Sequence, residues 1–98
     1  MNLTVPDKEK LQSVSRRNDV SLLGLFGSVA RGYAKRKSDV DVMVRFSKRK
    51  SLLDLVRIER EMSEALGQEV DLLTEASISP HLRDRIFDEM TVLYDDEA

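Results

Sequence analysis

Apolar and polar residues alternate along this chain at spacings that predict helices and strands in turn. After Pro6, the segment Asp7–Asn18 is mostly polar and carries two apolar residues three positions apart, Leu11 and Val14. This pattern predicts a first helix over Asp7–Asn18. The short apolar run Val20–Phe26 is typical of a buried strand. After Gly27, the segment Ser28–Lys35 fits a short helix whose first serine caps it.

The segment Asp39–Phe46 shows a period of two. Three alternate valines share one face of the predicted strand, and Asp39 and Asp41 lie on the other. This pattern predicts a half-buried strand that presents two carboxylates on one face.

The clearest helix begins with Ser51 and Asp54, a serine and an acid three residues apart that resemble a capping box, and it ends at Gly67. Apolar side chains recur along it at helical spacing, namely Leu52, Leu55, Val56, Met62 and Leu66. Glu59 interrupts this stripe, and the sequence leaves open whether it lies at the edge of the core or contacts a partner.

Three further elements complete the chain. Glu69–Thr74 alternates as a strand, Pro80–Glu89 begins with a residue suited to a first helical turn, and Thr91–Tyr94 fits a short closing strand. We therefore expect an α+β fold with a small mixed sheet covered by helices. At 98 residues, we expect one domain over residues 1–98.

The composition of the chain excludes several classes of function. The chain has no cysteine, which excludes disulfides and thiolate chemistry and favours a cytoplasmic location. The net charge of −2 argues against stable nucleic-acid binding, although residues 31–50 carry +6 and residues 51–98 carry −9. The longest apolar run, around Leu22–Phe26, is too short to span a membrane.

Paired carboxylates are the first candidate site. Asp39 and Asp41 lie two apart on a predicted strand, so their side chains point the same way and repel each other. A Mg²⁺ ion would remove that repulsion, and a third carboxylate from a neighbouring strand would complete a site for two metal ions. Asp71, which is flanked by apolar residues, is the natural third acid, while Glu69 and Glu75 remain alternatives.

A glycine and a serine lie between a predicted strand and a predicted helix, where free backbone N–H groups attract phosphate. Gly27 permits close approach of the backbone, and Ser28 adds a hydroxyl donor. Alone, this pair is very weak evidence for a phosphate site, because an ordinary turn with a serine cap has the same two residues. Its combination with a following pair of acids is what points to phosphate chemistry.

The stretch GSVARGYAKRKSDVDVMV, residues 27–44, resembles the signature of the polymerase-β-type nucleotidyltransferase superfamily. In so short a chain, the resemblance is greatest to the minimal nucleotidyltransferases, the MntA-like antitoxins that are paired with HEPN-domain toxins. This resemblance implies a polymerase-β-like fold and transfer of AMP from ATP to a tyrosine of a HEPN ribonuclease toxin.

The same resemblance implies roles for single residues. Asp39, Asp41 and Asp71 would be catalytic and would bind two Mg²⁺ ions. The triphosphate of ATP would be bound by Gly27 and Ser28, with Arg31 adding positive charge.

Two other functions are alternatives to AMP transfer onto a toxin. The chain could act as an antitoxin that binds and occludes its toxin without catalysis. A small-molecule adenylyltransferase of the aminoglycoside-modifying kind is disfavoured, because no additional domain is available to form an acceptor pocket.

Overall fold

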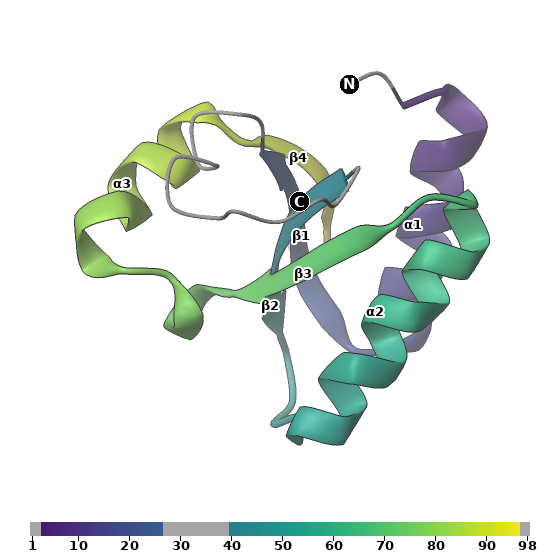
Figure 1. The fold of residues 1–98 in the computed structure, drawn as a ribbon, viewed down its shortest axis with the longest axis horizontal. Coiled ribbons are helices and arrows are strands. Elements are labelled where there is room, and N and C mark those ends of the chain that lie inside the picture. Colours follow the sequence, from purple (N-terminus) through teal and green to yellow (C-terminus); the bar gives the residue numbers. More distant parts are fainter. Residues whose placement is uncertain (1–2, 27–39, 97–98) are drawn as a thin grey trace.

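A four-stranded sheet with helices on both faces organises the chain in the computed structural model, which describes residues 3–26 and 40–96 (Figure 1). In chain order the elements are α1 (Val5–Arg17), β1 (Val20–Phe26), β2 (Val40–Phe46), α2 (Leu52–Leu66), β3 (Val70–Thr74), the short 3-10 turn η2 (Glu75–Ser77), α3 (Pro80–Glu89) and β4 (Thr91–Asp95).

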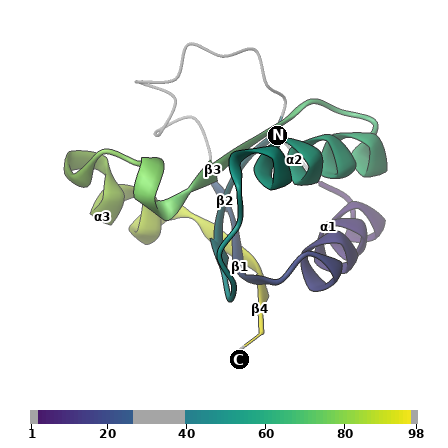
Figure 2. The same cartoon turned by 90° about the horizontal axis from the view of Figure 1, so that it is seen from below.

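The strands lie in the order β3-β2-β1-β4. Strand β1 is antiparallel to both of its neighbours, whereas β2 and β3 are parallel and are connected through α2. Figure 2 shows α1 and α2 on one face of the sheet and α3 on the other. The predicted α+β fold with a mixed sheet is therefore confirmed.

Strand β2 is buried on both faces, so the prediction of a half-buried strand was wrong. Its three alternate valines pack with Ile58 and Met62 of α2 in the larger core. Met43, on the opposite face, packs with Ile78 and Ile86 in a second core beneath α3. The alternation in the sequence predicted one buried and one exposed face. Strand β2 instead lies between two other strands, and helices cover both faces of the sheet, so both of its faces are buried. This burial depends on the tertiary arrangement.

Both long helices begin at a capping box. The Thr4 hydroxyl accepts a hydrogen bond from the Asp7 N–H, so α1 starts at Val5, two residues before the predicted start. The equivalent box at the start of α2 confirms the prediction made from Ser51. Helix α2 then ends as predicted at Gly67, whose φ of 68° is the left-handed conformation that glycine adopts readily.

The apolar stripe of α2 is only partly buried. Met62 is its one fully buried member, whereas Leu52 and Val56 in the first turns are exposed. Ile58, which the predicted stripe did not include, is also fully buried. The stripe predicted from sequence therefore marks the core correctly only toward the C-terminal end of the helix. The exposed residues become important at the site described below.

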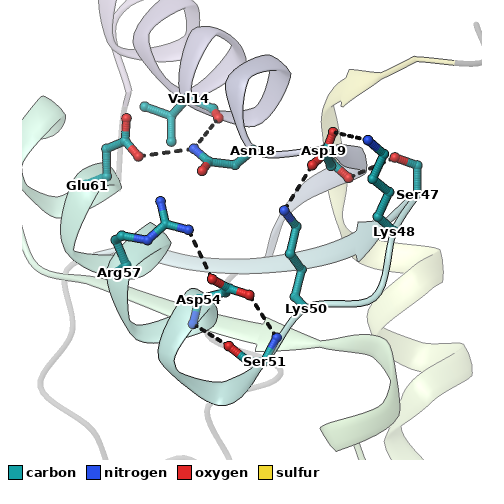
Figure 3. Close-up of polar contacts among 10 residues, drawn as sticks. All are labelled: Val14, Asn18, Asp19, Ser47, Lys48, Lys50, Ser51, Asp54, Arg57 and Glu61. Atoms are coloured by element: carbon teal, nitrogen blue, oxygen red, sulfur yellow. Dashed lines mark hydrogen bonds and ion pairs between the residues drawn. The ribbon is translucent and has the colours of Figure 1, made fainter.

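Polar side chains fix the turn between α1 and β1 (Figure 3). Buried Asn18 donates through Nδ2 to the Val14 carbonyl at 2.8 Å and to Glu61 Oε1 at 3.0 Å, joining α1 to α2. Asp19 Oδ2 accepts a hydrogen bond from Lys50 Nζ at 3.0 Å. These contacts join the α1–β1 turn to both α2 and the segment that precedes it.

The predicted helix Ser28–Lys35 and its following loop lie outside the described residues, as does Asp39. Thr91–Tyr94 is confirmed as the closing strand and extends to Asp95. Within residues 3–26 and 40–96, no helix has the length and apolar content needed to cross a bilayer.

Candidate active site

Three residues on adjacent strands form a row across the sheet. Phe26, the last residue of β1, pairs with Asp41 of β2, and Asp41 pairs in turn with Asp71 of β3. Adjacent strands lie about 4.8 Å apart, so the two aspartates are immediate neighbours. The structure therefore brings together two acids that lie 30 positions apart in the sequence.

Both carboxylates belong to the face of the sheet that α3 partly covers. Asp41 alternates with valines of the opposite core and shares its face with Met43, while Leu73, two residues after Asp71, packs against the second core. Asp41 is 2% exposed and Asp71 is 5% exposed. Both side chains are thus shielded from bulk water. Charges in such a buried environment interact more strongly than charges at an open surface.

The alternatives to Asp71 are placed differently. Glu69 precedes β3 and is exposed, and Glu75 lies beyond β3. Glu75 Oε1 accepts a hydrogen bond from Arg45 Nε at 2.9 Å. Of the three acids considered from sequence, Asp71 is the one paired with Asp41 across the sheet, which favours it as the third acid.

Four of the predicted site residues lie outside the described part of the chain: Gly27, Ser28, Arg31 and Asp39. In the sequence, Gly27 directly follows Phe26 and Asp39 stands one residue before Val40. In the sequence, the predicted phosphate motif therefore follows directly after Phe26, the residue that pairs with Asp41.

A pocket of about 320 Å³ lies between α2 and β3, which is the terminal strand of the described sheet. Its lining residues come from the first half of α2, from β3 and from η2, and they are Leu52, Leu55, Val56, Glu59, Asp71, Leu72, Leu73, Thr74 and Ser77. Sequence reasoning did not find this pocket. The one available signal was Glu59, which stood out as a charge within an apolar stripe.

The structure settles the position of Glu59. Its Oε2 accepts a hydrogen bond from the Leu72 N–H at 2.8 Å, and one helical turn later Ser63 Oγ accepts from the Val70 N–H at 3.0 Å. Two outward-facing donors of β3 are therefore bonded to side chains of α2. This arrangement covers an edge that would otherwise offer unpaired backbone groups, and it fixes Glu59 against the strand that carries Asp71.

The donor set of this site suits a hard divalent cation. Asp41 and Asp71 offer carboxylate oxygens, the ligands that Mg²⁺ prefers, and two buried carboxylates side by side are stabilised by a nearby positive charge. Among residues 3–26 and 40–96 there is no group of three or more potential metal ligands. The predicted third ligand, Asp39, is outside that part.

Comparison with known proteins shows to which protein family the chain belongs. Residues 7–93 match the family described as nucleotidyltransferase domain, and the chain belongs to that family. It is therefore a nucleotidyltransferase with a polymerase-β-like fold.

Two curated proteins and one solved structure show which members of this family the chain is similar to. The chain is 48% identical over 82 residues to MJ0435 of Methanocaldococcus jannaschii, to which protein adenylyltransferase activity is ascribed; the match covers 84% of this chain and 88% of that protein. It is 40% identical over 76 residues to the protein adenylyltransferase MntA of Thermococcus cleftensis, covering 78% and 73%. A solved toxin–antitoxin structure with AMP-PNP superposes with a TM-score of 0.70 at 26% identity, covering 90% of this chain and 73% of that one.

Proposed function

We propose that this chain is an antitoxin that transfers AMP from ATP to a tyrosine of a cognate HEPN-domain ribonuclease toxin. The observation that carries the proposal is the pairing of buried Asp41 on β2 with buried Asp71 on β3, in a chain of the nucleotidyltransferase family. This pair lies in the same row as Phe26, the last residue of β1. The adenylyltransferase relatives support AMP as the transferred group, and the toxin–antitoxin relative supports a toxin as acceptor. The family match over residues 7–93 supports a single domain.

In the proposed reaction, the tyrosine hydroxyl oxygen attacks the α-phosphorus of ATP. A new P–O bond forms to the tyrosine, the bond from the α-phosphorus to the bridging oxygen breaks, and pyrophosphate leaves with that electron pair. The hydroxyl proton passes to a carboxylate, and Asp71 is the candidate because it is among the residues that line the neighbouring pocket. The chain mainly positions the reactants and complements their charge.

Each predicted site residue has a role in this scheme. Asp39, Asp41 and Asp71 would hold Mg²⁺, which supplies charge neutralisation at the phosphates when bound. Gly27 and Ser28 would bind the triphosphate through backbone N–H groups and a hydroxyl, and Arg31 would add positive charge.

The added AMP would inhibit a nuclease by blocking its binding of RNA. An added AMP brings bulk and negative charge to a surface that must bind RNA phosphate, so it repels and occludes the substrate. The acidic segment 51–98, with a net charge of −9, suits docking against a basic RNA-binding surface.

The test combines this protein, ATP and Mg²⁺ with the HEPN-domain protein encoded beside its gene. Intact mass spectrometry should show one or more added AMP units on the toxin, and RNA cleavage should stop. Asp39→Asn/Asp41→Asn should do neither, whereas Asp84→Asn/Asp88→Asn, which changes two exposed carboxylates of α3, should act like the unaltered protein.

The binding-only alternative makes the opposite prediction. If the Asp39→Asn/Asp41→Asn variant neutralises the toxin as well as the unaltered protein, with no change of mass in either case, occlusion replaces catalysis as the function.

A further inference from the structure

The pocket between α2 and β3 lies on the outer side of Asp71, at the edge of the sheet. We propose that it receives the acceptor side chain, a hydroxyl-bearing aromatic residue, and that the first turns of α2 dock the basic protein segment that carries it. This inference rests on the proposed function and adds the place where the second substrate binds.

The order of strands determines from which side each substrate approaches. Reading across the sheet from β1 to its edge, the row runs Phe26, Asp41, Asp71 and then the pocket. The phosphate motif follows Phe26 directly, so the nucleotide belongs at the β1 end of the row. A nucleophile that attacks away from the departing pyrophosphate then approaches from the β3 end, where Asp71 lines the pocket.

The pocket matches one side chain better than a nucleotide. At about 320 Å³ it is at the small end of the roughly 300–1,000 Å³ typical of ligand sites. Leucines and a valine form most of its wall, which suits an aromatic ring. Polar residues, namely Asp71, Thr74 and Ser77, line the rest of the pocket and suit the hydroxyl end of such a side chain.

Exposed apolar side chains continue from the pocket onto the surface of α2. Leu52 and Val56 line the pocket, and Leu53, next to them in the first turn, is 80% exposed. Three large apolar residues together at the start of one helix are more than scattered surface residues, and such a group is typical of an interaction site. A protein segment that placed a side chain in the pocket would cover them.

The charges around the pocket favour a basic occupant. Its two ionisable lining residues, Glu59 and Asp71, are both acids. The nearby Arg57 donates a hydrogen bond to Asp54 at 3.1 Å, so its charge is already paired. A segment with lysines or arginines on either side of the acceptor residue therefore complements this surface.

The test measures AMP incorporation into the adjacent-gene HEPN-domain protein as its concentration is varied. Leu53→Gln/Val56→Gln removes apolar surface without adding charge and keeps good helix formers. We expect about a tenfold rise in KM for the acceptor protein, with the Kd for ATP, measured by calorimetry, unchanged. The matched control is Val5→Gln/Val92→Gln on α1 and β4, where the side chains are 68% and 49% exposed, against 80% and 47% for Leu53 and Val56.

A second variant tests the pocket itself. Val56→Trp should fill the pocket and reduce transfer while ATP binding persists, and Val92→Trp should do neither. Thermal melts of all variants show whether each is folded.

The outcomes separate the two proposals. If the unaltered protein transfers AMP and Leu53→Gln/Val56→Gln leaves KM unchanged, the acceptor site is wrong and the proposed function stands. If Val56→Trp weakens ATP binding instead, the pocket belongs to the nucleotide and the acceptor assignment is overturned. If the unaltered protein transfers no AMP, the proposed function fails, and the acceptor site fails with it.

Discussion

Asp41 and Asp71 occupy matching positions on the parallel strands β2 and β3, and both are buried. Two carboxylates in such positions repel each other when both are ionised, and the repulsion is stronger where water is excluded. A bound cation relieves it. The pairing therefore links the stability of the fold to the proposed metal.

Mg²⁺ should accordingly raise the melting temperature of the unaltered protein. At a concentration ten times the Kd, binding adds about 1.4 kcal/mol to the free energy of unfolding. Asp71→Asn should remove most of that rise by deleting one ligand charge, and Asp88→Asn on the exposed side of α3 should keep it. A full Mg²⁺-dependent shift in Asp71→Asn, measured by differential scanning fluorimetry, would place the metal elsewhere.

The contact between Glu59 and the edge of β3 gives a second prediction. Glu59→Ala leaves the Leu72 N–H without this acceptor and should lower the free energy of unfolding by about 1–3 kcal/mol. Glu59→Gln keeps a carbonyl oxygen in the same place and should cost clearly less. Urea denaturation of both variants measures the difference, and equal losses would show that the hydrogen bond is unimportant to stability.

Much of this fold could be predicted from local patterns. The start of α2 follows from a serine and an acid three residues apart, its end from Gly67, and both bounds of α3 from Pro80 and the strand that follows. These signals depend on backbone chemistry within a few residues, so the sequence carries them directly.

The arrangement of the site could be predicted only in part. The choice of Asp71 followed from its apolar neighbours and the family resemblance, but its pairing with Asp41 depends on strand order and register. The exposure of Leu52 and Val56 was missed because helical spacing identifies an apolar face and not what covers it. What packs against the first turns of α2 depends on the tertiary arrangement, which leaves a pocket there between α2 and β3.

Asn18 offers a third prediction, about the junction between α1 and α2. Its buried amide donates to both the Val14 carbonyl and Glu61, so Asn18→Ala should cost about 1–3 kcal/mol of unfolding free energy. Asn18→Asp should cost more at neutral pH, because it places a second carboxylate beside Glu61. Chemical denaturation at pH 7 and pH 4 should show Asn18→Asp recovering as pH falls; a loss equal to that of Asn18→Ala at both values would argue against the charge effect.

The last prediction concerns the pH dependence of the α2 cap. The Ser51 N–H, which donates to Asp54 at 3.0 Å, and then the Arg57 guanidinium lower the pKa of Asp54 from 3.8 to about 2. Because the pKa is lower in the folded state, ionised Asp54 stabilises the fold above pH 3.8, and this contribution is lost as pH falls toward 2.

Asp54→Asn should therefore melt at a modestly lower temperature than the unaltered protein at pH 7, and the gap should close between pH 4 and pH 2. Arg57→Gln serves as the matched control. It removes the smaller cause and leaves the Ser51 N–H in place, so it should retain most of the pH dependence. Thermal melts followed by circular dichroism across this range measure the gap. If it stays constant down to pH 2, the Asp54 charge contributes nothing to the cap and the hydrogen-bonding shape of the side chain accounts for the whole effect.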